Sequence, residues 1–542
     1  MTPTVHLRPW QKAAFDRFVE APGPDFLAVA TPGAGKTTFA LAAARHRLAQ
    51  EPSRLVIVAP TAHLKLQWAR AAATFSLHLD PLWSAADGAL PRDMHGIVTS
   101  YQQVATSAAV LARLSRDAFV ILDELHHAGD ERAWGAAIQT AFGGSSRRLA
   151  LSGTPFRSDT RAIPFVTYRG EEAVADFEYG YGDALADRRV VRPVYFPTTN
   201  GEMEWSAPDG SLHSATFDDP LDAARAGQRL RTALSLVGEW LPRVLRAAND
   251  RLTAVRREQP DAAGLVIATD REHARGIAAL LRARLGVSAR LVTSDDPLAS
   301  TAITGFASGR EAWLVAVRMV SEGVDIPRLR VGVYATTTTT ELFFRQAVGR
   351  LVRWTRGLPR QPAWLFIPDD ARLRAHATRI TELRRHSLRP GEVEARPDAS
   401  AEPPRDRADE QMSLFAVISA IATAASEPAA AEPAHDHDAV DETIPTEVEL
   451  VLAPPPPLEG DRLTAGAGAG EGAGRPIRRD QKRELRRANA DRARELARRL
   501  GLTHAEVNAE LNRRSGVRRV SEATTEQLDH RLSAAERWLR TT

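Results

Sequence analysis

Residues Ala30 to Thr37, Ala-Thr-Pro-Gly-Ala-Gly-Lys-Thr, have the composition and spacing of a phosphate-binding loop, with Ala30 where the general pattern has Gly. Residues 26–30 predict a short buried strand before the loop, and residues 37–49 an Ala-rich helix after it. Glycines in such a turn let backbone N–H groups face phosphates at a helix N-terminus. Lys36 can then reach the β- and γ-phosphates, and the Thr37 hydroxyl can bind Mg²⁺. The pattern predicts ATP and Mg²⁺ as ligands.

A second apolar run, residues 118–122, has the length of a strand and ends in Asp123 and Glu124. At the end of a parallel strand beside the phosphate loop, Asp123 would hold Mg²⁺. Glu124 could then orient and deprotonate the attacking water. His126 and His127 do not indicate a zinc site, because the chain has no cysteine and no second ligand pair at suitable spacing.

Further motifs follow in a fixed order: Ser152-Gly153-Thr154-Pro155, then residues 321–327 and residues 346–353. Together with the phosphate loop and the acidic pair, they resemble the motifs of superfamily 2 helicases and translocases, of the DExH rather than the DEAD type. The resemblance covers roughly residues 5–370. It implies two RecA-like halves that clasp ATP and couple its hydrolysis to movement along nucleic acid.

The resemblance also implies roles for individual residues. Those implied to bind ATP are Arg8, Gln11, Thr31, Pro32, Gly33, Ala34, Gly35, Lys36, Thr37, Thr38, Gly323 and Asp325, with Gln11 as the adenine reader. Those implied to be catalytic are Glu124, Gln346, Arg350 and Arg353, and those implied to bind the metal are Thr37 and Asp123. Those implied to couple hydrolysis to movement are His126, Ser152 and Thr154. Those implied to contact nucleic acid are Thr61, Gln67, Thr99, Ser100, Thr269 and Thr293.

Two departures from the family pattern bear on the assignment. Leu125 stands where Ala is commoner, which leaves both carboxylates intact. The arginine motif begins with Gln346, which favours the DNA-repair and restriction-type branches over RNA-remodelling DEAD-box proteins. Arg350 and Arg353 are three residues apart on one helix face, from which they could meet the γ-phosphate as arginine fingers.

The alternation of strands and helices predicts an α/β fold with two RecA-like parallel-sheet domains in tandem. We expect a first RecA-like domain at residues 1–190, an insert of β-hairpin and helices at 191–258, and a second RecA-like domain at 259–395. A disordered acidic linker at 396–474 and a small, basic, all-α domain at 475–542 complete the chain. The role of the insert, such as strand separation or substrate gripping, stays open.

The net charge of +3 over 542 residues hides a strong asymmetry. Residues 396–474 carry 4 arginines and 16 acidic residues, whereas residues 475–542 carry 18 basic and 10 acidic residues. Low hydrophobicity with high net charge predicts disorder for the first of these segments. The absence of cysteine excludes disulfides and thiol chemistry. With no signal pattern and no long apolar run, we expect a soluble, cytoplasmic protein without membrane contact.

One stretch of the acidic linker is different in character. Gln411-Met412-Ser413-Leu414-Phe415 resembles the pentapeptide with which bacterial DNA-processing proteins bind the replicative sliding clamp. Leu414 and Phe415 would fill an apolar pocket, while Gln411 and Met412 contact its rim. The alternatives are an amphipathic segment that packs back on the motor, or a chance match.

The basic C-terminal segment predicts three short helices. Residues 479–500 carry a rough apolar face, and Thr503 with Glu506 and Thr524 with Gln527 form two capping boxes. Their basic outer faces could bind DNA phosphates, or could simply be solvated surface.

The sequence therefore predicts an ATP-dependent DNA helicase or translocase. Two alternatives remain: an RNA helicase, which the Gln346-led motif disfavours, and an ATP-gated DNA-binding scaffold that does not unwind. A scaffold would be marked by loss of Glu124 or of an arginine finger, and the chain retains both.

Overall fold

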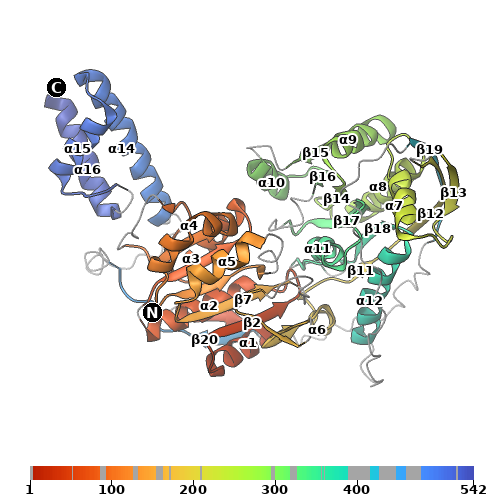
Figure 1. The fold of residues 1–542 in the computed structure, drawn as a ribbon, viewed down its shortest axis with the longest axis horizontal. Helices are drawn as coiled ribbons and strands as arrows, with labels where there is room; N and C mark the ends of the chain where they lie inside the picture. The colour runs from red at the N-terminus through yellow and green to blue at the C-terminus, as the bar shows by residue number, and fades with distance from the viewer. Residues whose placement is uncertain are drawn as a thin grey trace. The chain divides into compact units, whose positions relative to one another are not determined.

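A computed structural model describes residues 4–541 except 52, 86–92, 126–131, 154–162, 170–171, 208–209, 294–298, 318–325, 356, 359–360, 389–415, 427–446, 459–477 and 521–522. The chain divides into two compact units (Figure 1). The first unit comprises residues 1–29, 35–178 and 446–542, and the second comprises residues 30–34 and 179–445. Each unit is built on its own sheet.

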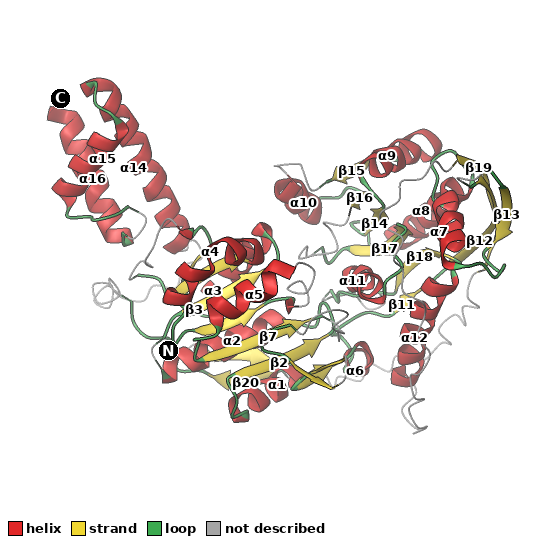
Figure 2. Cartoon of the chain, in the orientation of Figure 1, coloured by secondary structure: helices red, strands yellow, loops and turns green. Residues whose placement is uncertain are grey.

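The first unit contains a seven-stranded sheet in the order β10-β2-β7-β6-β3-β5-β4 (Figure 2). Its strands are β2 (Asp25–Ala30), β3 (Leu55–Ala59), β4 (Leu79–Asp80), β5 (Gly96–Ser100), β6 (Phe119–Leu122), β7 (Arg147–Ser152) and β10 (Phe177–Tyr179). The strands from β2 to β4 in this order pair in parallel. Their carboxyl ends therefore meet at one edge of the sheet.

Helices cover both faces of this sheet, because its central strands are apolar on both sides. The helices are α1 (Pro9–Glu20), α2 (Lys36–Gln50), α3 (Ala62–Thr74), α4 (Tyr101–Leu114) and α5 (Arg132–Phe142). Val56 and Val58 of β3 share a buried cluster with Val104 of α4. On the opposite face, Phe18 of α1 packs against the rings of Phe26 and Phe119. Two small strands, β8 (Thr167–Arg169) and β9 (Glu172–Val174), form a separate hairpin.

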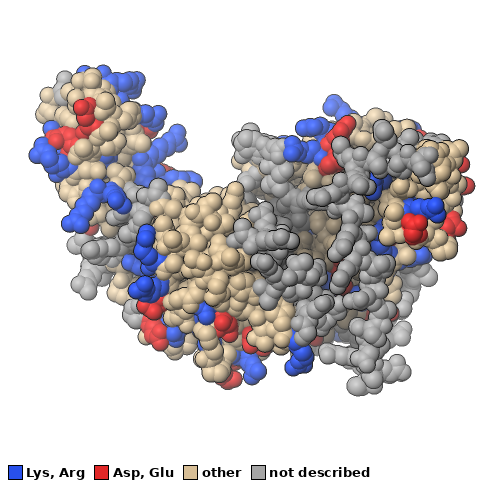
Figure 3. All heavy atoms as spheres, viewed as in Figure 1, with Lys and Arg blue, Asp and Glu red and all other residues tan. Residues whose placement is uncertain are grey.

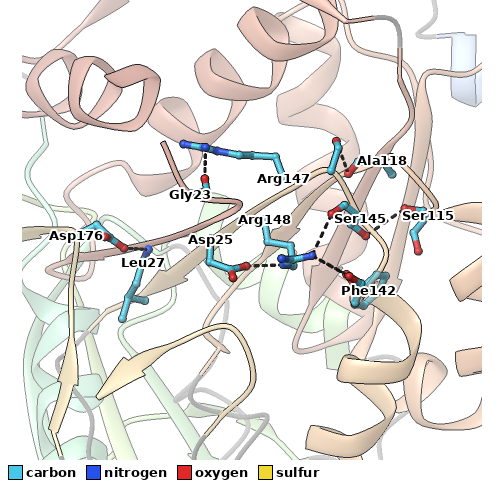
Figure 4. A network of polar contacts seen from close by, with 12 residues as sticks. Gly23, Asp25, Leu27, Ser115, Ala118, Phe142, Ser145, Arg147, Arg148 and Asp176 are labelled. Carbon is cyan, nitrogen blue, oxygen red and sulfur yellow. Dashed lines mark hydrogen bonds and ion pairs between the residues drawn. The ribbon is translucent and has the colours of Figure 1, made fainter. Parts of the chain in front are cut away.

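The amino ends of β2 and β7 are joined by a network of polar contacts (Figure 4). The guanidinium of Arg148 contacts the carboxylate of Asp25 and donates to the carbonyls of Phe142, at 2.9 Å, and Ser145, at 3.0 Å. Arg147 next to it donates to the carbonyl of Gly23. Buried charges need such partners, so this network fixes the sheet at the edge opposite the strands' carboxyl ends.

The second unit contains a larger sheet, with the strand order β13-β12-β18-β17-β14-β16-β15 and two strands off this path. Its strands are β11 (Val194–Tyr195), β12 (Thr198–Ser206), β13 (Leu212–Thr216), β14 (Ala263–Ala268), β15 (Ala289–Val292), β16 (Trp313–Val317), β17 (Leu329–Ala335), β18 (Ala363–Pro368) and β19 (Ala416–Ser426). Strands β14 to β18 pair in parallel. The helices of this unit are α6 (Tyr181–Ala186), α7 (Ala223–Ala233), α8 (Trp240–Glu258), α9 (Arg271–Leu285), α10 (Ala299–Ser308), α11 (Glu341–Leu351) and α12 (Ala371–Leu388).

The predicted insert, residues 191–258, is part of the second sheet rather than a separate accessory. Its β12–β13 hairpin forms as the sequence indicates, with Trp205 opposite His213. Strand β12 also pairs with β18, and residues of α8 share the central core of the unit with those of β14 and β17. The buried Trp205 and Trp240 belong to that same core, so residues 191–258 pack as part of the second unit.

Two segments of the predicted disordered linker form strands. Strand β19 pairs antiparallel with β12 over most of its length. Ala420 and Ala422 are buried there, whereas Ile421 between them is 56% exposed. Such alternation is typical of a strand with one buried face. The second segment is β20 (Val448–Val451), which pairs antiparallel with β1 (Thr4–Leu7) in the first unit.

After β20 the chain continues along the first unit. The fully buried guanidinium of Arg45 donates to the carbonyls of Leu452, at 2.9 Å, and Ala453, at 3.0 Å. A ring nitrogen of His95 lies 3.2 Å from the carbonyl oxygen of Pro456. Because a buried arginine without acceptors is costly, this returning segment is a structural part of the first unit.

Three helices, α14 (Arg478–Leu500), α15 (His504–Ser515) and α16 (Thr525–Thr541), form the C-terminal bundle as predicted. Their apolar residues form a small core that includes Leu496, Leu511 and Trp538. Arg531 of α16 is 1% exposed and donates to the side-chain oxygens of three asparagines. These are Asn489 of α14 and Asn508 and Asn512 of α15. One arginine thus links all three helices, and burial lowers its pKa.

The bundle is attached to the first unit through a buried ion pair. Lys482 and Asp93 are 2% and 3% exposed, and their charged atoms lie 2.6 Å apart. Asp93 also accepts hydrogen bonds from the backbone N–H and the hydroxyl of Thr525. A paired, hydrogen-bonded, buried charge of this kind fixes relative orientation. Residues 475–542 are therefore grouped with the first unit, which differs from the independent domain that the sequence suggests.

The predicted fold class is confirmed, because both units are built on parallel sheets with helices between the strands. The first sequence half ends nearer residue 178 than residue 190. Among the described residues, no helix is both long enough and apolar enough to cross a membrane.

Candidate functional site

The carboxyl edge of the first sheet brings together residues that are far apart in the sequence. Strand β2 leads into the phosphate loop, β6 into Asp123 and Glu124, and β7 into Ser152 and Gly153. The order β2-β7-β6 makes these three strands neighbours. In open parallel sheets, ligands bind at this edge.

Lys36 and Glu124 form the centre of the site. The ammonium nitrogen of Lys36 lies 2.8 Å from Oε1 of Glu124, and the two side chains are 11% and 26% exposed. The other carboxylate oxygen of Glu124 accepts a hydrogen bond of 3.0 Å from the backbone N–H of Gly153. Glu124 thus connects the phosphate loop to the end of β7.

The backbone of Glu124 adopts a positive φ of 49°. The left-handed region costs a non-glycine residue roughly 1–2 kcal/mol. Strained conformations of this kind are concentrated at functional sites. The positive φ of Glu124 therefore agrees with a functional role for its carboxylate, whose direction the backbone sets.

Asp123 is 8% exposed and is held by two aromatic residues. The indole N–H of Trp68 donates to its Oδ2 at 2.7 Å, and the hydroxyl of Tyr101 donates to its carbonyl oxygen at 2.9 Å. Burial, with the nearby Asp123 and Glu124 carboxylates, raises the pKa of Tyr101 well above its ordinary value. Its hydroxyl therefore stays protonated and donates at any physiological pH. Both aromatic residues directly follow residues that the resemblance implies for nucleic-acid contact, Gln67 and Ser100, but no motif predicts their bonds to Asp123.

The phosphate loop is supported from α1. Gln11 is 3% exposed, its Nε2 donates to the carbonyl of Gly35 at 2.9 Å, and its Oε1 accepts from the backbone N–H of Arg8 at 2.8 Å. A Cβ at Gly35 would lie 2.6 Å from that Nε2, and Gly35 has φ of 101°. Glycine is therefore required here on both counts. In this structure Gln11 contacts the loop itself, and an adenine contact stays a prediction.

The oxygen groups at this edge fit a hard divalent cation. Asp123 supplies a carboxylate and Thr37, in the first turn of α2, a hydroxyl. Among the residues that the structure describes, no three His, Asp or Glu side chains gather into a metal site of their own. Mg²⁺ is usually held by one or two carboxylates together with substrate phosphates and water, and Asp123 with Thr37 would supply ligands of this kind.

The residues implied to contact nucleic acid in the first unit lie at the end of β5, after β3 and on α3. Thr61 caps α3 by accepting from the N–H of Leu64, and Ser100 caps α4 by accepting from the N–H of Gln103. Gln67 is partly exposed on α3. Thr99 is fully buried, and its hydroxyl donates to Gln103. The hydroxyl of Thr99 therefore does not lie at the surface, unlike the contact that the resemblance implies.

In the second unit, Gln346 and Arg350 lie on α11, which ends at Leu351. Arg353 lies beyond that end, so the two arginines do not share a helix face as the sequence predicts. Arg353 forms a β-bridge with Val191. Next to it, the buried Arg192 donates to the carbonyl of Pro327, at 2.9 Å, and to the hydroxyl of Thr355, at 3.0 Å. Burial and the neighbouring Arg330 and Arg353 lower the pKa of Arg192 to about 9. Arg192 thus supports the arginine motif, a role that no sequence pattern indicated.

Thr269 and Thr293 follow β14 and β15, at the carboxyl edge of the second sheet. Thr269 donates to the carbonyl of Ala335 at 3.4 Å. Thr31, Pro32, Gly33 and Ala34 lie in the loop between β2 and α2, and Thr38 lies in the first turn of α2. Eight other predicted site residues lie outside the described residues. These are His126, Thr154, Gly323, Asp325, Gln411, Met412, Leu414 and Phe415.

Comparison with known proteins agrees with the motifs of the first unit. Residues 4–157 match the family model described as the res subunit of type III restriction enzymes. This match confirms the predicted resemblance to restriction-type superfamily 2 proteins. It runs from β1 to a few residues past the end of β7, and so includes Lys36, Asp123, Glu124 and Gly153.

Two curated relatives come from mycobacteria. An uncharacterised protein of Mycobacterium tuberculosis is 46% identical over 391 residues, which cover 70% of this chain and 64% of the relative. An uncharacterised protein of Mycobacterium leprae is 45% identical over 390 residues, which cover 70% of this chain and 65% of the relative. The matched region thus spans just under two thirds of each relative.

Solved structures show more distant likeness. A fragment assigned as an HsdR subunit of a type I restriction enzyme from Vibrio vulnificus has 15% identity and a TM-score of 0.49, covering 69% of this chain and 67% of that one. The type ISP restriction-modification enzyme LlaBIII, bound to DNA, has 14% identity and a TM-score of 0.45, covering 68% of this chain and 28% of that one.

Proposed function

We propose that this chain is an ATP-dependent DNA translocase or helicase whose ATP hydrolysis is stimulated by nucleic acid. The observation that carries the proposal is the contact of Glu124 with Lys36 and with the N–H of Gly153, beside the buried Asp123. A carboxylate held between a phosphate-loop lysine and the end of a neighbouring strand is placed to act on a γ-phosphate. A purely structural ion pair would not require the strained backbone at Glu124.

In the proposed mechanism, the loop from Thr31 to Thr38 cradles the phosphates, and Thr37 and Asp123 bind Mg²⁺. When bound, the ion would neutralise charge on the phosphate oxygens. Phosphate binding would draw the ammonium of Lys36 away from Glu124, because one ammonium cannot fully serve both anions. Glu124 would then be released to orient the attacking water. In this way the ion pair would keep the carboxylate inactive until ATP is bound.

The second unit would supply the remaining charge. Arg350 and Gln346 of α11, together with Arg353 beyond its end, would stabilise the γ-phosphate in the transition state. Gly323 and Asp325 would contact ATP from the segment after β16. Ser152, His126 and Thr154 would transmit hydrolysis to the residues that contact nucleic acid in the two units. Alternating grip on the phosphates would then move the protein along a strand.

Nucleic-acid preference provides the direct test of the proposed function. We expect DNA to stimulate ATP hydrolysis more than RNA of the same length and sequence. An ATPase assay with single-stranded, duplex and forked DNA and with RNA measures this, with Lys36→Ala as the blank. Stronger stimulation by RNA would favour an RNA helicase. Nucleotide-dependent DNA binding without hydrolysis would favour a scaffold.

The C-terminal bundle offers a surface for DNA phosphates. Basic side chains gather over its helices (Figure 3). On α14, four exposed arginines lie on one face at the spacing i, i+4, i+11 and i+15, namely Arg483, Arg487, Arg494 and Arg498. At 1.5 Å per residue this arginine stripe is about 22 Å long. Within the stripe, Arg494 pairs with Asp491, and on α15 both Arg513 and Arg514 bond to Glu510.

Replacing the arginine stripe by alanine should weaken DNA binding and reduce its salt dependence. Each lost phosphate contact lowers the log–log salt slope by about 0.7–0.9. Fluorescence anisotropy of labelled DNA at several salt concentrations measures the slope. The matched control is the double substitution Arg513→Ala and Arg514→Ala, which removes charge from the same bundle. Equal slopes in both variants and the wild type would show that the stripe is solvated surface.

We also propose that Gln411, Met412, Leu414 and Phe415 bind a bacterial sliding clamp. The pentapeptide immediately precedes β19, which pairs with β12 of the second unit, so a bound clamp would be connected directly to that unit. A labelled peptide of residues 406–422 should bind purified clamp weakly, and Leu414→Ala with Phe415→Ala should abolish binding. Affinity should be weak because a short peptide loses conformational entropy when it becomes ordered. Absence of saturable binding would exclude this partner.

A further inference from the structure

The residues that hold Asp123 come from the two helices whose first turns are implied to contact nucleic acid. Trp68 lies on α3, next to Gln67 and seven residues after Thr61. Tyr101 is the first residue of α4 and follows Ser100 directly. Both aromatic side chains are buried, at 3% and 1% exposed. They point inward while their neighbours in sequence are partly exposed.

The two helices are also joined to each other. The ammonium of Lys65 on α3 donates to Oε1 of Gln103 on α4 at 2.7 Å. The same Gln103 oxygen accepts from the backbone N–H of Ser100 at 3.2 Å. Burial lowers the pKa of Lys65, an effect that the carboxylate of Asp80 opposes. The first turns of α3 and α4 therefore form one hydrogen-bonded platform.

From this platform, two hydrogen bonds reach Asp123, one to its side chain and one to its backbone. Asp123 immediately precedes Glu124, whose backbone is in the left-handed region. A shift of α3 and α4 would thus move both the carboxylate of Asp123 and the peptide that sets the direction of Glu124. Close-packed interiors transmit such small shifts because they cannot absorb them.

We propose that Trp68 and Tyr101 are positioning residues that couple nucleic-acid binding at α3 and α4 to the geometry of Asp123 and Glu124. This inference rests on the proposed function and names the path by which nucleic acid would stimulate hydrolysis. Nucleic acid that contacts the platform would favour one placement of Asp123, and ATP with Mg²⁺ at Asp123 would favour the same placement of the platform. By linkage, each ligand must then raise the affinity for the other by the same factor.

The test measures this coupling factor at equilibrium, without turnover. The affinity of full-length protein for labelled single-stranded DNA is determined by anisotropy with and without AMP-PNP and Mg²⁺. The affinity for labelled AMP-PNP is determined with and without DNA. We expect a factor within about 5–150 for the wild type, the usual range for coupled sites. Tyr101→Phe keeps the ring and removes the donor, whereas Trp68→Phe removes the donor and replaces the indole by a smaller aromatic ring. Each variant should bring the coupling factor to within about twofold of unity, while the affinity for each ligand alone changes less than about threefold.

Trp83→Phe is the matched control. Trp83 is 1% exposed in the core cluster that also contains Tyr101, and its indole nitrogen has no hydrogen-bond partner among the described residues. This variant should keep the wild-type coupling factor, even if it lowers the melting temperature as much as Trp68→Phe does. In steady-state assays, Trp68→Phe should lower the ratio of DNA-stimulated to basal kcat and leave the DNA concentration for half-stimulation nearly unchanged.

Wild-type coupling in both Trp68→Phe and Tyr101→Phe would overturn the inference and assign these bonds to folding alone. Loss of coupling in Trp83→Phe as well would also overturn it, because the effect would then follow core packing. A wild-type protein that is stimulated by DNA but shows no equilibrium coupling would refute the inference and leave the proposed function standing. A protein that neither binds nor hydrolyses ATP would refute the proposed function itself.

Discussion

Glu124→Gln should bind ATP nearly as well as the wild type and hydrolyse it about 10²–10⁴-fold more slowly, the usual effect of removing a general base. Glutamine has nearly the same shape and keeps one oxygen that can accept the bond from Gly153. It cannot take a proton from water, and it replaces the ion pair with Lys36 by a neutral contact. Turnover should therefore fall while phosphate binding is preserved.

Fluorescent-nucleotide titration and a steady-state ATPase assay separate these two effects. Lys36→Ala should differ from Glu124→Gln by losing nucleotide affinity as well as turnover. The control is Glu51→Gln, which neutralises an exposed carboxylate paired with Arg47 at the end of α2. It should leave both quantities unchanged. Near-normal turnover by Glu124→Gln would show that the catalytic carboxylate lies elsewhere.

Arg350→Ala and Arg353→Ala should each lower kcat by about 10³–10⁵, the range for arginine fingers in phosphoryl transfer. Their charge would act mainly on the transition state, so the affinity for ATP should change only modestly. Arg192 should show a weaker effect of the same kind, because it supports the segment that carries Arg353 and would not touch the phosphate.

Arg345→Ala is the control for the arginine fingers. Arg345 lies on the same helix and pairs with Glu341 one turn earlier, so its loss removes a charge from α11 without removing the proposed fingers. Pre-steady-state measurement of the hydrolysis step is the sharpest readout, because product release can mask a slower chemical step. If Arg350→Ala and Arg353→Ala turn over as fast as Arg345→Ala, hydrolysis does not use charge from the second unit.

The sequence predicts the strands well because buried parallel strands read as continuous apolar runs. The predicted strands at residues 26–30 and 118–122 form β2 and β6, each with a difference of one residue at its start. The same apolar runs also predict where the candidate site lies. Once the parallel strands are recognised, residues that follow β2, β6 and β7 must meet at one edge, and the Lys36–Glu124 contact follows.

Contacts between distant segments could not be predicted in this way. The bond from Trp68 to Asp123 spans 55 residues, and the pair of Lys482 with Asp93 spans 389. Neither leaves a local pattern in the sequence. Strand β19 was missed for a different reason. Its buried positions are alanines, which lower the apparent hydrophobicity of a segment that lies inside an acidic, Pro-rich stretch.

The return of the chain to the first unit has a consequence for biosynthesis. Strand β1 pairs with β20, which the ribosome makes about 440 residues later. At 5–20 residues per second this interval is about 20–90 s. Throughout it, Arg45 lacks the carbonyls of Leu452 and Ala453, and Asp93 lacks Lys482. The N-terminal unit therefore leaves the ribosome without these partners of Arg45 and Asp93, and it completes its fold only after the second unit has been made.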